Sequence, residues 1–352
     1  MLDLFFAITV IQLRILSVLL LFCACSDSKE LRLQKFLFKG NLALKDQDKE
    51  LAIRYFNEAL NIDPCFADAL NNLGTIEFQQ KEYNDALDYY NKALACRPSF
   101  LDVYFNRANT YYELKEYYNA SQDVQRMIAA RPDTAIAWYT QGLIANAMHD
   151  YASALAAFDK AILLDSSNVA YRVNRGTVRY YRHELEDEMK DLEIAKKMYA
   201  GEPTIYNTMA MIEISRGRHD LAMLHIQEAL RLSPRQPYFL NNRGFVFLMQ
   251  NRLKEGLHDI DQSILLDPAN GWAYRNKGVY YLMTKDYPNA IRLLQQALST
   301  DPSIERTHFY LGMAYLKNNQ RMEACEQFEL SDRAGDGMVT SDLMKLCRTS
   351  KK

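Results

Sequence analysis

Five asparagines recur in this chain at separations of 34 residues or a multiple of 34, and their side chains could bind another polypeptide. They are Asn72, Asn106, Asn174, Asn242 and Asn276. An asparagine amide carries a donor and an acceptor together, which matches the C=O and N–H groups of a peptide backbone. A row of such amides could therefore hold an extended chain without reading its side chains. The alternative is that asparagine is simply a common choice at this position of a repeated unit.

Large aromatic residues lie close in sequence to the last two asparagines. Tyr238 and Phe245 flank Asn242, and Trp272 precedes Asn276 by one helical turn. Aromatic side chains supply much of the binding energy at protein interfaces. We therefore expect a peptide-binding groove in which asparagines hold the backbone and these aromatic residues act as anchors. The alternative for Phe245 is packing against the neighbouring helix.

Residue types that do covalent or metal chemistry are present but are not grouped in sequence. The six histidines are scattered, and the chain contains no HExxH, no Cys-x-x-Cys pair with zinc spacing, no GxGxxG, no Walker loop and no GxSxG elbow. The repeated units described next also leave no segment for a catalytic domain. We therefore expect no enzymatic activity, no metal site and no cofactor.

Helix-breaking and small residues reveal the elements that must position these side chains. Counting units of 34 residues from Leu33, six of the nine prolines fall at position 32 and seven of the 13 glycines at position 8. Alanine fills position 20 in seven units and position 27 in six. Proline ends or begins a helix, and small residues let two helix backbones approach closely. Each unit is therefore predicted to be a pair of amphipathic helices joined by a short turn, with large residues filling the space around their contact.

This pattern resembles the tetratricopeptide repeat family, whose unit is a 34-residue helix-turn-helix. The second unit, residues 67–98, shows it well: ADALNNLGTIEFQQKEYNDALDYYNKALACRP. The resemblance covers 33–338 and implies an all-α, right-handed superhelical solenoid of about nine repeats, with a capping helix and basic tail over 339–352. Unit three departs from the pattern, with Ala108 where glycine is usual.

The resemblance also implies that the first helix of each unit lines a concave groove. Positions 2, 6, 9 and 13 form one stripe of that helix. The five asparagines stand at position 6, and Tyr238, Phe245 and Trp272 stand at positions 2, 9 and 2. The family says little else about function, because its motif residues are packing residues.

The first 24 residues have the features of a signal peptide of the lipoprotein type. Arg14 precedes a ten-residue apolar stretch, which is too short to span a bilayer. Ala24-Cys25 resembles the bacterial lipoprotein box, in which the cysteine becomes the lipidated first residue, and 25–32 would be a linker. The alternative is an uncleaved membrane anchor from Leu4 through Ala24. Either version predicts a membrane-anchored protein of the bacterial cell envelope, at the outer membrane or on the periplasmic face.

Four further cysteines lie in the repeats and the tail: Cys65, Cys96, Cys325 and Cys347. An exported chain could oxidise them, and Cys325 with Cys347 is the pair that the sequence favours. We nevertheless expect buried free thiols at all four positions, because disulfide geometry is demanding.

Charge and repeat pattern together define the expected function. A net charge of −2 argues against a broad nucleic-acid surface. A row of basic residues at position 7, which includes Arg107, Arg175 and Arg243, is expected to pair with acidic residues of the chain itself. We expect a membrane-tethered protein-protein interaction scaffold that binds an extended peptide or a partner helix in its groove. Two alternatives remain: a structural assembly factor for an envelope secretion or pilus machine, and an envelope carbohydrate-binding module.

Overall fold

The computed structural model describes residues 29–182, 188–335 and 337–348, and all regular structure in these ranges is helical. The expectations for the leader over 1–24 and for Cys25 lie outside the described residues. Residues 29–32, at the end of the range expected as a linker, belong to the helix over 29–45. Within the described ranges, no helix is both long enough and apolar enough to cross a membrane.

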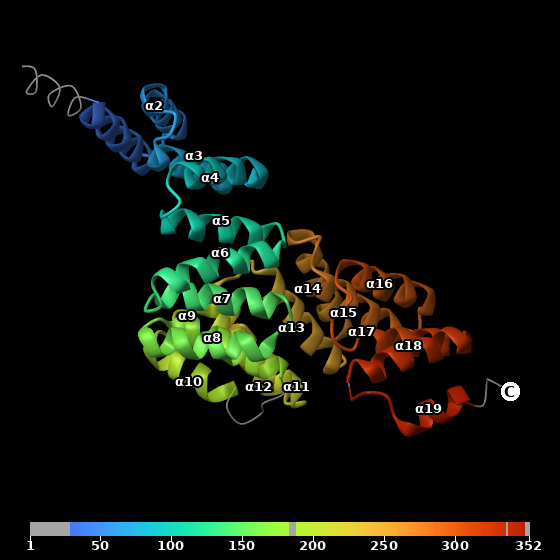
Figure 1. The fold of residues 1–352 in the computed structure, drawn as a ribbon. Helices are drawn as coiled ribbons and strands as arrows, with labels where there is room; N and C mark the ends of the chain where they lie inside the picture. The colour runs from blue at the N-terminus through green and yellow to red at the C-terminus, as the bar shows by residue number, and fades with distance from the viewer. Residues whose placement is uncertain (1–28, 183–187, 336, 349–352) are drawn as a thin grey trace, which may run out of the picture. The chain divides into compact units, whose positions relative to one another are not determined.

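Helices follow one another in pairs, and each pair occupies one 34-residue unit (Figure 1). The first pair is a helix over 29–45 and α2 (Lys49–Ile62). The next pairs are α3 (Ala67–Gln80) and α4 (Tyr83–Cys96), α5 (Leu101–Glu113) and α6 (Tyr117–Ala130), α7 (Ala135–Ala147) and α8 (Tyr151–Leu164), and α9 (Val169–Tyr181) and α10 (Glu188–Met198). The last are α11 (Pro203–Ser215) and α12 (His219–Leu232), α13 (Pro237–Met249) and α14 (Leu253–Leu266), α15 (Gly271–Met283) and α16 (Tyr287–Thr300), and α17 (Thr307–Lys317) and α18 (Arg321–Arg333).

The frame counted from the sequence is the frame of the helices. From the second repeat to the eighth, the first helix begins at position 1 of its repeat. The ninth repeat differs, because α17 begins at Thr307, which is position 3. The expected capping helix is present as α19 (Ser341–Arg348).

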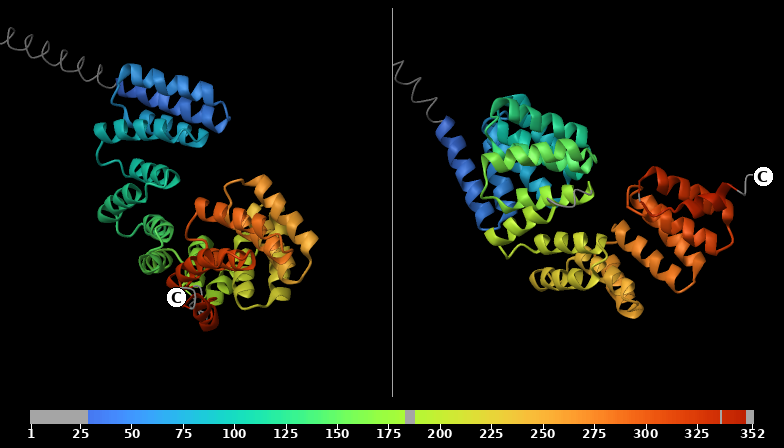
Figure 2. Two further views of the ribbon diagram at one scale, coloured as in Figure 1. Left: turned by 90° about the vertical axis from the view of Figure 1, so that its right-hand side faces the viewer. Right: turned by 90° about the horizontal axis from the view of Figure 1, so that it is seen from below.

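The chain divides into two compact units, each made of several repeats. The first unit is Met1–Ser166 and the second unit is Ser167–Lys352. Helices α2 to α8 belong to the first unit, and α9 to α19 belong to the second. Within each unit, a helix packs against the helices before and after it in the chain, so that successive pairs stack (Figure 2). This is the stacking that a repeat too small to bury its own apolar face requires.

Small residues allow the two helices of a repeat to approach closely. At Gly74, a Cβ atom would lie 2.7 Å from the ring of Tyr90, which stands at position 24 of the same repeat. The same contact joins Gly40 to Phe56, Gly142 to Phe158 and Gly312 to Phe328. The alanines of positions 20 and 27 have no exposed surface. The glycine and alanine pattern of the sequence therefore reports helix packing.

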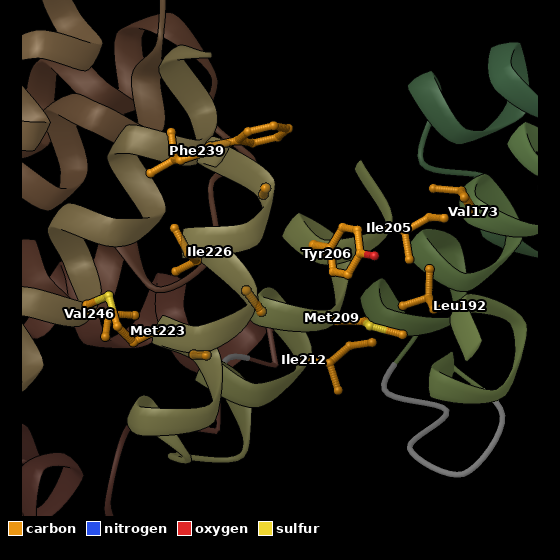
Figure 3. Packing of buried hydrophobic residues seen from close by; sticks show 14 of the residues in the cluster. Val173, Leu192, Ile205, Tyr206, Met209, Ile212, Met223, Ile226, Phe239 and Val246 are labelled. Carbon is orange, nitrogen blue, oxygen red and sulfur yellow. The ribbon is translucent and has the colours of Figure 1, made fainter. Parts of the chain in front are cut away.

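In the second unit, one hydrophobic core runs through successive repeats. Val173, Leu192, Ile205, Met209 and Ile226 belong to it, and Figure 3 shows their side chains between the helices that carry them. These five residues come from two repeats, and Phe239 and Val246 of the next repeat belong to the same cluster, so the core is shared between repeats. The helices that carry the site described below are therefore held by neighbours on both sides.

Two disulfides join the four cysteines of the described chain, Cys65 to Cys96 and Cys325 to Cys347. The prediction of free thiols is therefore wrong at all four positions, although the favoured pair is one of the two. The first bond joins the turn after α2 to the end of α4, and the second joins α18 to α19. The Cys65–Cys96 bond was missed because its partners, in neighbouring repeats, meet only when the repeats stack.

Candidate functional site

A hollow of about 340 Å³ opens in the second unit, among the helices that come first in their repeats. It is lined by residues of α9, α11, α13 and α15, by the turn before α17, and by Tyr310 on α17. Five of the eight residues predicted for the groove line it: Asn174, Asn242, Tyr238, Phe245 and Trp272. The other three do not, because Asn72 and Asn106 belong to the first unit and Asn276 is buried behind the wall. A hollow of this volume is large enough to take a few side chains of a ligand.

The lining residues fall on a wider face of the first helices than the predicted stripe. Positions 2, 6, 9 and 13 all contribute, as expected, and positions 5 and 12 contribute as well. Arg275 and Asn241 stand at position 5, and Tyr180 and Ile214 stand at position 12. On an α-helix these positions lie beside the predicted ones, and a face that packs or binds is commonly more than 100° wide.

The asparagines tie successive repeats together. In three repeats, the side-chain amide at position 6 donates a hydrogen bond to an asparagine oxygen at position 5 of the preceding repeat. Asn242 donates to Asn207 at 2.8 Å, Asn276 donates to Asn241 at 2.8 Å, and Asn106 donates to Asn71 at 2.9 Å. Asn72 donates instead to Asn41, at position 9 of the first repeat, at 2.8 Å. The row therefore has a structural role, and peptide binding by it stays a prediction.

Asn276 lies behind the residues that line the hollow. Its side chain is 1% exposed, and its oxygen accepts hydrogen bonds from Arg275. Both ends of the amide are therefore engaged inside the protein. Asn174 lines the hollow, and its amide donates to the Ala170 carbonyl at 2.9 Å.

The aromatic anchors differ in exposure. Tyr238 is 46% exposed, whereas Phe245 is buried and Trp272 is half-buried. Burial raises the pKa of the Tyr238 hydroxyl, and the nearby carboxylate of Asp267 raises it further. Phe245 therefore packs inside the protein, as the alternative for it stated, and also forms part of the wall of the hollow.

Arg275 is the main residue of the site that sequence reasoning missed. It is 7% exposed, and its charge lies 4.8 Å from the Trp272 ring and 5.3 Å from the Phe245 ring. Its Nε and Nη2 atoms donate to Asn276 Oδ1 at 3.0 and 2.7 Å, and Nη1 donates to the Glu305 carbonyl at 3.1 Å. The sequence does distinguish this residue, because Arg275 is the only charged residue at position 5 of the nine repeats.

The three arginines at position 7 form ion pairs within the protein, as predicted. Arg107 contacts Asp123 at 2.7 Å, and Arg243 contacts Asp259 at 2.6 Å. Arg175 pairs with Asp191 at 2.6 Å in the same way. In each pair the aspartate stands at position 23 of the same repeat. These cations are therefore structural and do not face the hollow.

The described residues contain no group of three or more histidine, cysteine or acidic side chains that could hold a metal ion. The lining of the hollow includes amides, aromatic rings and one buried guanidinium.

Family models of the tetratricopeptide repeat match this chain at residues 36–64, 67–100, 105–169 and 246–305. The search of the curated proteins finds no match.

Solved structures similar to this chain are helical-repeat proteins of low sequence identity. A chain of the APC/C hetero-tetramer Cut9–Hcn1 is 20% identical with a TM-score of 0.61; the match covers 85% of this chain but only 59% of that one. A tetratricopeptide repeat protein from Parabacteroides merdae is 21% identical with a TM-score of 0.61, covering 67% of this chain and 94% of that one. PilF of Pseudomonas aeruginosa is 20% identical with a TM-score of 0.53, covering 60% and 96%. At this identity the likeness concerns the fold alone. From its 34-residue frame, its paired helices and the family models that match it, the chain belongs to the tetratricopeptide repeat family.

Proposed function

We propose that this protein is a membrane-tethered interaction scaffold whose second unit binds an extended segment of a partner protein. The tetratricopeptide fold supports a protein-protein interaction scaffold. The observation that carries the proposal is the hollow, where Asn174, Asn242, Tyr238, Phe245 and Trp272 come together from three helices. Residues far apart in sequence that meet around one opening are typical of a binding site.

The lining suits a peptide because it offers polar and aromatic contacts side by side. An amide oxygen has two lone pairs and an amide nitrogen has two hydrogens. Asn242 uses one hydrogen for Asn207, so its second hydrogen is available to a peptide carbonyl. Tyr238 is exposed enough to contact a ligand directly. An extended segment could therefore bond to amides while its side chains contact the rings.

The proposed setting is the bacterial cell envelope, with the protein anchored by a lipid on Cys25. The two disulfides support this setting, because disulfides persist in oxidising compartments and are rare in the cytosol. The apolar stretch after Arg14 and the Ala24-Cys25 pair support export with lipidation.

Partner capture tests the proposal. The Tyr238→Ala, Trp272→Ala double variant should recover at least about tenfold less of a partner crosslinked in intact cells, because aromatic anchors at interface centres often contribute about 2 kcal/mol each. Recovery is measured by quantitative mass spectrometry after purification from membranes. The matched control is Tyr118→Ala, which removes a 70% exposed tyrosine from the first unit.

The two variants separate a role of the hollow from a general effect of losing surface tyrosine. The control should recover the partner as the wild-type protein does. If the double variant is folded and recovers every partner at the wild-type level, the hollow does not bind them and the proposal is refuted.

A further inference from the structure

Two half-buried arginines elsewhere in this chain, Arg107 and Arg243, have a counter-ion supplied by their own repeat. Arg107 pairs with Asp123 and Arg243 pairs with Asp259, and in both pairs the carboxylate is almost completely buried. Each pair is bidentate, with Nε and Nη2 donating to the two carboxylate oxygens. Such pairing is what the burial of a guanidinium normally requires.

Arg275 is buried, and in the part of the chain that the structure describes no aspartate or glutamate lies within ion-pair distance of its side chain. Its acceptors are neutral, the amide oxygen of Asn276 and the backbone carbonyl of Glu305. They engage one N–H on each nitrogen, so two of the five N–H groups of the guanidinium have no acceptor there. A buried charge of this kind is costly unless a ligand completes its environment.

The backbone near Arg275 departs from the repeat pattern. Non-glycine residues with positive φ otherwise occupy position 15, in the turn between the two helices of a repeat: Gln47, Lys81, Lys115, His149, Asn251, Lys285 and Asn319. Arg306 is the exception among the described residues, with a φ of 61° at the N-terminus of α17. The late start of α17 leaves the Glu305 carbonyl free of that helix, and it accepts the Arg275 hydrogen bond. Unusual backbone held in place by its surroundings is common at binding sites.

The surroundings of Arg275 are aromatic and lie on the hollow. Trp272 and Phe245 are within cation–π distance, and all three residues line the hollow. Burial lowers the pKa of Arg275, the charge of Arg306 lowers it further, and Tyr310, Tyr180 and Glu305 act in the opposite direction. An anion that reaches the guanidinium would therefore meet a cation largely stripped of water, where charge-assisted hydrogen bonds are strong.

We propose that Arg275 binds the side-chain carboxylate of an acidic residue in the bound peptide, and that Trp272 and Phe245 contact a large apolar side chain next to it. This rests on the proposed function, because the hollow must first bind a peptide. The two remaining N–H groups of Arg275 would donate to the carboxylate. The aromatic rings would exclude water from this contact and give the pair its preference for an acidic residue beside an apolar one.

The test uses the fluorescence of Trp272 in the full-length protein. The chain has two tryptophans, and a Trp138→Phe background leaves Trp272 as the only one. Two blocked peptides are titrated, acetyl-Gly-Phe-Glu-Phe-Gly-amide and its counterpart with Gln in place of Glu. We expect the glutamate peptide to bind at least about tenfold more tightly, because bidentate charge-assisted bonds are about twice as strong as neutral ones. A second pair of probes, 3-phenylpropionate and 3-phenylpropionamide, presents the same two chemistries without a peptide.

Arg275→Met should remove the preference, so that both peptides bind equally. The matched control is Arg243→Met, which removes a half-buried arginine that is not among the residues lining the hollow. Because Arg243→Met leaves Asp259 buried alone, it should lower the thermal midpoint and keep the tenfold preference. Arg275→Met removes a charge that has no counter-ion, so its thermal midpoint should fall less than that of the control. This combination separates a binding role from a structural one.

Three results would overturn the proposal. The wild-type protein could bind the glutamate and glutamine peptides equally, or the preference could persist in folded Arg275→Met. Binding of 3-phenylpropionate together with no binding of either peptide would assign the site to a free small acid instead. Equal binding of the two peptides combined with partner loss in the Tyr238→Ala, Trp272→Ala variant would refute only the role of Arg275. Acid preference combined with unchanged partner recovery would support Arg275 as the carboxylate contact and refute the partner role of the hollow.

Discussion

The residues at positions 8 and 24 of a repeat face each other, and their sizes vary together. Wherever an aromatic residue fills position 24 of a described repeat, position 8 is glycine, as in Gly74 with Tyr90. The third repeat has Ala108 at position 8, and Val124 fills its position 24. Both are fully buried, so the smaller valine compensates for the extra methyl group of the alanine. The departure seen in the sequence is therefore a local exchange of volume.

Gly74→Ala should lower the free energy of unfolding by about 1–3 kcal/mol, because the new Cβ would lie 2.7 Å from the Tyr90 ring. In a Tyr90→Val background the same substitution should cost about 1 kcal/mol less, since the valine leaves room as in the third repeat. Urea unfolding followed by circular dichroism measures all four members of this double-mutant cycle. A coupling energy of zero would contradict the steric explanation.

The element that closes the second unit is the short helix α19. Val339, Leu343 and Met344 pack against a cluster that contains Phe328 of α18. A helix of eight residues is not stable alone in water, so α19 depends on this packing and on the Cys325–Cys347 bond. Together they cover the apolar face that the last repeat would otherwise expose.

Cys347→Ser should free α19 from α18. A loop of this length contributes about 3 kcal/mol when closed by a disulfide, and most of that loss should appear as local opening. Hydrogen exchange followed by mass spectrometry should show faster exchange in α19 and unchanged exchange in α11 to α14. As a control, Cys65→Ser should speed exchange in the first unit and leave α19 as it is. Equal protection of α19 in both variants would show that its packing does not need the bond.

At the scale of the whole molecule, the chain is a repeat array for which we propose a setting outside the cytoplasm. Within each unit, helices pack mainly against the helices of their own and adjacent repeats, and no described helix could cross a bilayer. In the proposed arrangement the attachment to the membrane therefore depends on the leader and Cys25. The two disulfides agree with such a setting.

Cys25→Ser should abolish incorporation of labelled palmitate and reduce the amount of protein in the membrane fraction, because the lipid would have no attachment site. Metabolic labelling and fractionation of cells measure both effects. Cys23→Ser is the matched control, since it changes the other leader cysteine and should leave labelling intact. Undiminished labelling of the Cys25→Ser protein would refute lipidation at this residue.

Much of the fold could be predicted because its information is local and repeated. Positions 8, 20 and 27 are small in most repeats, where the two helices must touch, so the register of helices follows from the 34-residue frame. The meeting of Asn242, Tyr238 and Trp272 also followed, since residues on one face of successive first helices must line one surface. The hydrogen bonds of the asparagine amides between repeats could not be predicted from the sequence, because an amide can bond equally to a ligand or to a neighbouring repeat.

The sequence by itself determined the helices, their pairing and the stripe from which the site is built, because periodicity and residue size act within and between adjacent repeats. The tertiary structure alone decided which charged side chains and cysteines find a partner inside the protein and which remain available to a ligand. Among the described residues it pairs Arg243 with Asp259 but places no carboxylate within ion-pair distance of the buried Arg275, and it joins Cys65 to Cys96. The physical reason is that burial, counter-ions and disulfides depend on distances between repeats. Those distances arise only when the repeats stack.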